Sequence, residues 1–392
     1  MRDAVEIDVA VFGGGIAGLW LLNRLCALGF DALLFEKTAL GAGQTIASQG
    51  IIHSGVKYTF DGVTRPQTEA LSSMPRIWMD CIAGRGEVDL RGTEILAEYQ
   101  LMFTTGGLLN RVAGSLATKA LRSDVAALER EEFPDIFRTR EFDGNVYRLK
   151  EPVLASRTVI AALRGSLKRK IYVADAKELR RERDGITQIS LGASIIRPRA
   201  SVFTSGTGNE WFAEEIGLDK TKVTQRRPLR MFLARGLPYK LYAHCLVPEP
   251  KPRVTVTTHD FDGENVWYLG GNIAEKAVGM SDNEPLRWAH SEMTKIFPWL
   301  DWESVRWAIH DVDRAEPAAN KLLPSGPTLT TIGNAALAWP TKLALAPALT
   351  QQALRWLEQQ NVSPSGKSTE LSLPLAEAAR YPWEEVREWI QL

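Results

Sequence analysis

The chain has 392 residues, which is more than one hydrophobic core usually serves and suits two domains. Hydrophobic residues make up 45% and charged residues 24%, and 47 basic residues balance 47 acidic ones, so the overall charge does not favour binding to nucleic acid or an anionic membrane. Three cysteines without CxxC or metal-type spacing predict no disulfide, no metal centre and a reducing, cytoplasmic location. We also expect no signal peptide and no membrane-spanning segment, because no apolar run is long enough.

The first 36 residues predict a strand, a glycine turn, a helix and a second strand. Residues 7–12 are apolar and read as a buried strand. Residues 16–28 follow as a helix that Gly29 ends, and residues 32–35 form the next short apolar run. This order is that of a βαβ unit.

The glycine turn carries a G-x-G-x-x-G motif formed by Gly13, Gly15 and Gly18. In such motifs the first glycine permits a tight turn, the second lets the backbone approach a pyrophosphate, and the third lets helix pack against strand. Glu36 ends the second strand about 20 residues later, where an acid accepts ribose hydroxyls. The motif predicts dinucleotide binding; the alternative is a glycine turn with a packing role alone.

The rest of the chain alternates irregular, helical and strand-rich stretches. Residues 37–60 predict a long functional loop, because they are rich in Gly, Ser and Thr without helical periodicity. Residues 157–168 predict a helix after Pro152, and residues 171–204 predict a strand meander. Residues 254–269 predict a hairpin that turns at Asp262 and Gly263, and residues 347–360 predict a C-terminal helix.

Two later segments favour FAD over NAD as the dinucleotide. Residues 201–208 form a strand that runs into small residues, and residues 339–342 (Trp-Pro-Thr-Lys) lead into the C-terminal helix. A simple NAD-binding Rossmann domain needs neither segment.

With these landmarks the chain resembles the D-amino-acid oxidase and glycine oxidase superfamily of FAD-dependent oxidoreductases. The landmarks are the glycine motif with Glu36, the loop 41–50, Pro152 before its helix, Thr204-Ser205-Gly206, residues 314–317 (Arg-Ala-Glu-Pro) and the proline-containing C-terminal helix. Residues 51–58 (Ile-Ile-His-Ser-Gly-Val-Lys-Tyr) are similar to a segment of L-2-hydroxyglutarate and glycerol-3-phosphate dehydrogenases. The chain departs from the family at Pro340-Thr341-Lys342, where a Gly-rich loop is usual.

The resemblance implies an α+β fold, in which a Rossmann-type FAD-binding domain is interleaved with an antiparallel-sheet substrate domain. We expect residues 1–56, 140–225 and 310–392 in the FAD domain, and residues 57–139 and 226–309 in the substrate domain. The resemblance also implies non-covalently bound FAD. The residues predicted to contact it are Gly13, Gly15, Ile16, Ala17, Gly18, Glu36, Lys37, Gln44, Thr45, Ser48, Gln49, Gly50, Val173, Ser205, Gly206, Pro340, Thr341 and Lys342.

Three residues are candidates for the chemistry itself. Lys342 precedes a helix N-terminus and would stabilise negative charge on the flavin, or else is a solvated loop lysine. His53 has a side chain suited to proton transfer near neutral pH, although a structural hydrogen bond or covalent flavin attachment are alternatives. Arg314 lies where the family often has an arginine near the flavin. Ser48, Gln49 and Lys57 are secondary candidates.

An arginine cluster suggests an anionic substrate, because a guanidinium group binds both oxygens of a carboxylate. Its members are Arg226, Arg227, Arg230 and Arg235, each of which could equally form a surface salt bridge. Aromatic residues that could wall the pocket, or else pack in the core, are Tyr242, His259, Trp267 and Tyr268.

These features predict a FAD-dependent oxidoreductase that removes a hydride from a carbon bearing a hydroxyl on a small, anionic molecule. Amine or amino-acid oxidation is an alternative, and a flavin-binding regulatory protein with little turnover is another. We expect a small-molecule substrate and no nucleic acid partner. Oxygen, a quinone and a protein remain open as electron acceptors, and the oligomeric state is open too.

Overall fold

A computed structural model describes residues 4–55, 71–106, 125–182, 185–192, 194–249, 251–281, 284–318 and 326–392. Val56, Lys57 and Tyr58, which belong to the segment of local similarity, lie outside the described residues. No helix within these ranges is both long and apolar enough to cross a bilayer.

The predicted βαβ unit is the centre of the first sheet, which has eight strands in the described part of the chain. Strands β18, β11, β1, β2 and β8 lie parallel in this order, and β17, β10 and β9 add antiparallel pairs. Their bounds are β1 Ala4–Phe12, β2 Ala32–Glu36, β8 Ile171–Val173, β9 Glu178–Glu182, β10 Gly185–Leu191, β11 Ser194–Phe203, β17 Thr328–Ile332 and β18 Ala335–Trp339.

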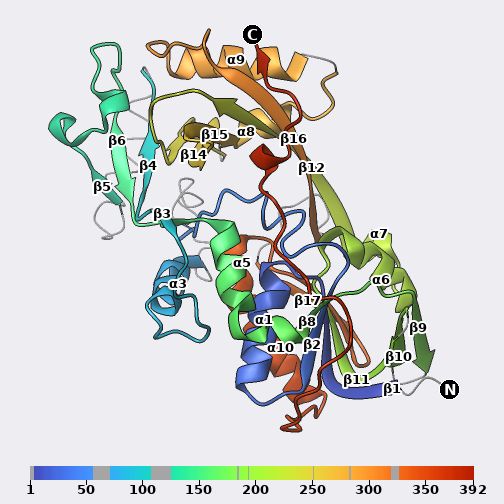
Figure 1. Cartoon of the computed structure of the whole chain (residues 1–392). Helices are drawn as coiled ribbons and strands as arrows, with labels where there is room; N and C mark the ends of the chain where they lie inside the picture. Colours follow the sequence, from blue (N-terminus) through green and yellow to red (C-terminus); the bar gives the residue numbers. More distant parts are fainter. Residues whose placement is uncertain are drawn as a thin grey trace.

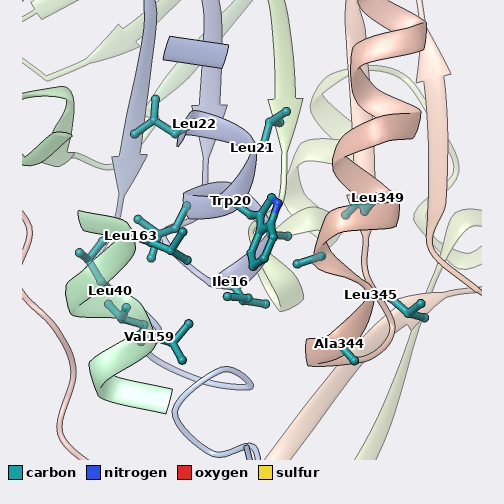
Figure 2. Close-up of a cluster of buried hydrophobic side chains, with 14 of the residues drawn as sticks. Ile16, Trp20, Leu21, Leu22, Leu40, Val159, Leu163, Ala344, Leu345 and Leu349 are labelled. Carbon is teal, nitrogen blue, oxygen red and sulfur yellow. The ribbon is translucent and has the colours of Figure 1, made fainter. Parts of the chain in front are cut away.

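Three helices cover one face of this sheet, as Figure 1 shows for α1, α5 and α10. The strand β1 alternates between faces, because Val9 and Val11 pack toward these helices while Ala10 and Phe12 belong to the core on the other side. Figure 2 shows Trp20 of α1 between α5 and the start of α10. The helices of the described chain are α1 Ile16–Ala27, α3 Met74–Ile82, α5 Ser156–Arg164, α6 Asn209–Glu215, α7 Lys220–Val223, α8 Asn272–Lys276, α9 Glu284–Ile296 and α10 Ala346–Gln359, with 3-10 turns at Arg130–Glu132, Asp135–Phe137, Gly165–Lys170, Gly206–Gly208, Leu343–Leu345 and Pro382–Glu384.

The second sheet is nearly all antiparallel and has nine strands in the described ranges, in the order β19-β16-β12-β15-β14-β13-β4-β6-β5. Their bounds are β4 Gln100–Phe103, β5 Val125–Ala127, β6 Val146–Leu149, β12 Thr224–Arg235, β13 Ala243–Cys245, β14 Val254–Phe261, β15 Glu264–Gly270, β16 Arg306–Pro317 and β19 Ile390–Gln391. A separate pair joins β3 (Ile95–Ala97) to β7 (Val153–Leu154). These two sheets confirm the predicted α+β class, with a Rossmann-type unit and an antiparallel sheet interleaved along the chain.

Four strands of the second sheet, β6, β12, β16 and β19, fall partly or wholly within residues predicted for the FAD domain. β6 pairs with β4, the last part of β16 pairs with β12, and β19 pairs with β16. The C-terminal segment runs from the first sheet, where the Val173 N–H of β8 donates to the Pro374 carbonyl oxygen at 2.7 Å, to the second sheet. There Trp383 stacks on His259 of β14, with ring centroids 4.1 Å apart.

Candidate active site

A cavity of about 1620 Å³ extends from the glycine turn to strands β12 and β16. Pockets for one drug-sized ligand usually measure ~300–1,000 Å³, so this cavity has room for a dinucleotide and a second molecule. His53 and Arg314 line it, as do most predicted cofactor residues: Gly13, Gly15, Ile16, Ala17, Glu36, Lys37, Gln44, Thr45, Ser48, Gln49, Gly50, Ser205, Gly206, Pro340, Thr341 and Lys342.

The glycine turn presents the N-terminus of α1 to the cavity. Gly13 has φ +99°, a conformation that side chains disfavour. Gly15 is the N-cap residue of α1 and supplies no side-chain capping bond. The Ile16 N–H donates to Thr45 Oγ1 at 3.1 Å. The first turn of an α-helix has N–H groups without intrahelical partners, so this end of α1 suits a pyrophosphate.

Glu36 lies at the end of β2, as predicted, and its carboxylate is oriented by backbone groups. The Gly14 N–H donates to Oε2 at 2.7 Å and the Thr38 N–H donates to Oε1 at 2.9 Å. Both contacts hold the acid beside the glycine turn, where the ribose of a bound dinucleotide would lie.

Two predicted cofactor residues, Gly18 and Val173, are not among the cavity-lining residues of the described chain. A Cβ atom on Gly18 would lie 2.0 Å from the Gly13 carbonyl oxygen, so this glycine permits close helix–strand packing. The Val173 N–H donates to the Pro374 carbonyl oxygen at 2.7 Å, and its neighbour Ala174 lines the cavity instead.

The loop after β18 places Lys342 in the cavity wall. Thr341 adopts φ +61°, although a β-branched residue is strongly disfavoured in that region. Helices α3 and α1 hold this loop from behind: Trp78 of α3 donates Nε1–H to the Ala344 carbonyl oxygen at 3.0 Å, and Trp78 packs against Trp20 of α1 at 4.8 Å between ring centroids. Strain held in this way is typical of functional loops.

The Lys342 ammonium group is largely shielded from water. Burial lowers its pKa to about 8, while Glu316 and Glu151 oppose that shift. A cation in such a position interacts strongly with negative charge that develops nearby, because the surroundings screen it less than water would. Lys342 is therefore half-buried in the cavity wall, and its role toward the flavin stays a prediction.

His53 lies within the segment predicted as a long loop and pairs with a buried carboxylate that the sequence did not point to. Its Nδ1 lies 3.0 Å from Oε2 of Glu151, whose side chain is 0% exposed. Ser54 donates both its backbone N–H and its hydroxyl to Oε1 of Glu151, at 2.6 and 2.7 Å. His244 of β13 lies beyond, with ring centroids 6.0 Å from His53.

A second charged cluster covers the cavity from β12, β16 and α8. Arg227 lies 3.1 Å from Glu316 and 3.6 Å from Glu275, and Arg314 lies 3.3 Å from Glu275. Lys251 also pairs with Glu275. Burial and the neighbouring Arg227 lower the pKa of Arg314.

The protein-family comparison matches residues 8–340 to the FAD dependent oxidoreductase family, abbreviated DAO. A probable FAD-dependent oxidoreductase of Pseudomonas aeruginosa is 39% identical over 388 residues, which cover 98% of this chain and 99% of the relative. The chain belongs to this family. FAD is thus its cofactor, and the α1 N-terminus without a side-chain cap from Gly15, the glycine approach and the size of the cavity fit it.

Solved structures agree with this assignment of the fold. The crystal structure of the Pseudomonas aeruginosa FAD dependent oxidoreductase has a TM-score of 0.85 at 36% identity, covering 98% of this chain and 99% of that one. Glycine oxidase from Bacillus cereus has a TM-score of 0.65 at 15% identity, covering 90% and 95%. L-α-glycerophosphate oxidase from Mycoplasma pneumoniae, solved with FAD bound, has a TM-score of 0.65 at 13% identity, covering 96% and 97%. The last two similarities concern the fold alone.

The four clustered arginines of this flavoenzyme do not all face the cavity. Within the described chain only Arg227 of the four lines the cavity. Arg226 pairs with Glu210 and Asp313, Arg230 with Asp311, and Arg235 with Glu264. Side chains alternate along a strand, so Arg227 and its cavity-lining neighbours Leu229 and Met231 share one face of β12, whereas Arg226 and Arg230 share the other.

The aromatic residues proposed as pocket walls do not line the cavity: Trp267, Tyr268 and His259 are buried elsewhere, and Tyr242 is partly exposed. Trp267 and Tyr268 are 0% exposed, and neither they nor Tyr242 and His259 are among the described residues that line the cavity. The sequence reasoning also missed Glu151, Lys251, Glu275 and Glu316. Glu316 belongs to the same Arg-Ala-Glu-Pro segment as Arg314, so its position in the sequence could have indicated it. The other three residues lie in segments without a recognisable motif.

Proposed function

We propose that this flavoenzyme oxidises a carbon bearing a hydroxyl group on a small anionic substrate, with the anionic group held at Arg227 and Arg314. The proposal depends chiefly on one observation: this arginine pair, His53 and Lys342 line the same cavity as the FAD-binding glycine turn. Bound FAD supplies the acceptor for the two electrons and the hydrogen of the C–H bond.

The charge of the substrate follows from the cluster around Glu275. Three cations, Arg227, Arg314 and Lys251, surround that carboxylate, and Arg227 also engages Glu316. Two other carboxylates of the cavity wall have partners of their own: Asp313 accepts from Arg226 and Glu249 accepts from Asn272. Within this cluster three cations face two carboxylates, Glu275 and Glu316, and that excess favours an anionic group.

The remaining side chains divide the work of oxidation. His53 accepts the hydroxyl proton, since an imidazole is a suitable base near neutral pH. Lys342 stabilises the negative charge of the reduced cofactor. Oxidation of an amine is the second candidate, because glycine oxidase shares the fold and Glu275 and Glu316 are carboxylates in the same wall.

The proposal can be tested by anaerobic bleaching of the bound flavin. The FAD-loaded protein is mixed with hydroxy acids, polyol phosphates and amino acids, and absorbance is followed. We expect bleaching by an anionic hydroxy compound, without release of ammonia. Bleaching by amino acids alone, with ammonia released, would assign amine oxidation instead.

A further inference from the structure

The Glu151–His53 pair extends the active site beyond the residues that the proposed function uses. Glu151 lies in the segment between β6 and β7, 98 positions from His53 in the sequence, and its side chain is fully enclosed. A buried carboxylate is costly unless charges and hydrogen bonds compensate it. Here Oε1 contacts Ser54 and Oε2 contacts His53.

One oxygen anchors the carboxylate and the other meets the histidine. Oε1 accepts the N–H and the hydroxyl of Ser54, at 2.6 and 2.7 Å. Oε2 faces Nδ1 of His53 at 3.0 Å. Because Ser54 directly follows His53, the same backbone turn fixes both the carboxylate and the ring that it contacts.

We propose that Glu151 is a positioning residue that holds the proton of neutral His53 on Nδ1, so that Nε2 carries the lone pair that accepts the proton of the substrate. A carboxylate beside Nδ1 selects this tautomer, because only the Nδ1–H form donates to it. The same charge stabilises the imidazolium that forms, without itself taking up the proton. This inference rests on the proposed role of His53 and adds the group that makes it basic.

The proton step balances within these groups. The O–H bond of the substrate breaks, an N–H bond forms at Nε2 of His53, and Nδ1 keeps its own proton facing Glu151. The imidazolium is then paired with a carboxylate, so the buried site gains no uncompensated positive charge. His244 and Lys342 are the other titratable groups near the pair in the described chain: His244 contacts Thr255 Oγ1 through Nδ1 at 2.8 Å, and Lys342 interacts electrostatically with Glu151.

The test is a histidine side-chain NMR titration of the FAD-loaded protein labelled with ¹⁵N. The chain has only five histidines, so each resonance can be assigned by substitution. We expect neutral His53 to show the Nδ1–H tautomer in the wild type. In Glu151→Gln we expect its titration midpoint to fall by at least about one unit, because an amide cannot stabilise the imidazolium as a carboxylate does.

A matched control is Glu385→Gln. Glu385 acts electrostatically on His310, so this variant should move the His310 titration and leave that of His53 unchanged. If Glu151→Gln does not fold, Ser54→Ala removes one anchor of the carboxylate, and a smaller fall in the His53 midpoint is expected.

Three results would overturn the proposal. They are an Nε2–H tautomer in the wild type, an unchanged His53 midpoint in Glu151→Gln, or a stoichiometric metal ion in the purified protein that this variant loses. The last is a genuine outcome, since ligand atoms of His53, Glu151 and His244 lie within 4.8 Å of one another. Failure of the proposed function is distinguishable, because a His53→Asn variant that bleaches at the wild-type rate would remove the base role of His53 while the NMR result stands.

Discussion

Arg227 of β12 lies directly opposite Arg314 of β16, and both guanidinium groups contact the same carboxylate, that of Glu275. Like charges placed opposite each other in a sheet are destabilising. The pair is therefore held together by Glu275, and each guanidinium remains within reach of the cavity. An anionic substrate group would relieve the repulsion that the two arginines retain.

Replacing Arg314 should weaken substrate binding more than cofactor binding. A hydrogen bond to a charged group is worth about 1.5–3 kcal/mol, so we expect Arg314→Met to raise KM of a bleaching substrate roughly 10- to 150-fold. FAD content should be retained. Arg226→Met is the matched control, because Arg226 lies on the opposite face of β12 and pairs with Glu210. Equal KM values for the two variants would contradict an anion site at Arg314.

Lys342→Met should lower the reduction potential of the bound flavin. It removes a buried cation that favours the reduced cofactor, and losing one preorganised donor to a developing anion typically costs ~3 kcal/mol. We also expect weaker sulfite adduct formation and slower substrate reduction, with FAD still bound. Redox titration of the folded variant is the measurement. A potential equal to that of the wild type would assign charge stabilisation to backbone N–H groups of the same loop.

Lys342 should contribute a stability that rises with pH between its folded and unfolded pKa values. Its pKa is lowered to about 8 in the fold, chiefly by burial, from an ordinary value of 10.5. Between these values the unfolded chain binds more protons than the folded one, so stability rises with pH. Urea unfolding of wild type and Lys342→Met at pH 7.5 and 10 should show the difference in unfolding free energy shifting in favour of the wild type at the higher pH, whereas burial raises the thiol pKa values of Cys26 and Cys245 and so affects both proteins alike.

Alanine at two glycines of the motif should separate cofactor binding from folding. In Gly18→Ala the new Cβ would lie 2.0 Å from a backbone oxygen, and we expect a loss of roughly 1–3 kcal/mol or more in stability. In Gly15→Ala the nearest atom is Thr45 Oγ1 at 3.1 Å, so the fold should survive while FAD binds at least about tenfold more weakly, about 1.4 kcal/mol. Urea denaturation and FAD titration measure the two effects. If Gly15→Ala bound FAD as tightly as the wild type, this glycine would not be required for the backbone to approach the pyrophosphate.

Thr341→Gly should leave the thermal stability of the FAD-loaded protein unchanged or higher. A residue held in a disfavoured conformation costs of order 1–3 kcal/mol, and glycine removes that cost at φ +61° for an entropic penalty of ~0.5–1 kcal/mol. Thr341→Ala keeps the strain and loses the hydroxyl, so its melting temperature should fall. An equal fall in both variants would show that the threonine side chain itself stabilises the loop.

The sequence by itself determined the cofactor-binding half of this protein. Gly13, Gly15 and Glu36 are close in the chain, and the conformations and contacts that they require are local, so their spacing was informative before any fold was known. The hairpin turn at Asp262 and Gly263 could also be predicted from local sequence, because a tight turn depends on adjacent residues, and both have positive φ. The resemblance to a flavoprotein superfamily then placed the later landmarks in order.

Only the tertiary structure decided how charges combine in the site. Glu151 meets His53 from 98 residues away, and Glu275 meets Arg314 across two elements, so no sequence spacing could relate them. Strand alternation directed Arg227 toward the cavity and its neighbours Arg226 and Arg230 away from it. Trp267 and Tyr268 are consecutive on β15 and lie on opposite faces of the sheet, yet both are buried, in two different hydrophobic clusters. Only the tertiary structure shows that both faces of this strand are covered.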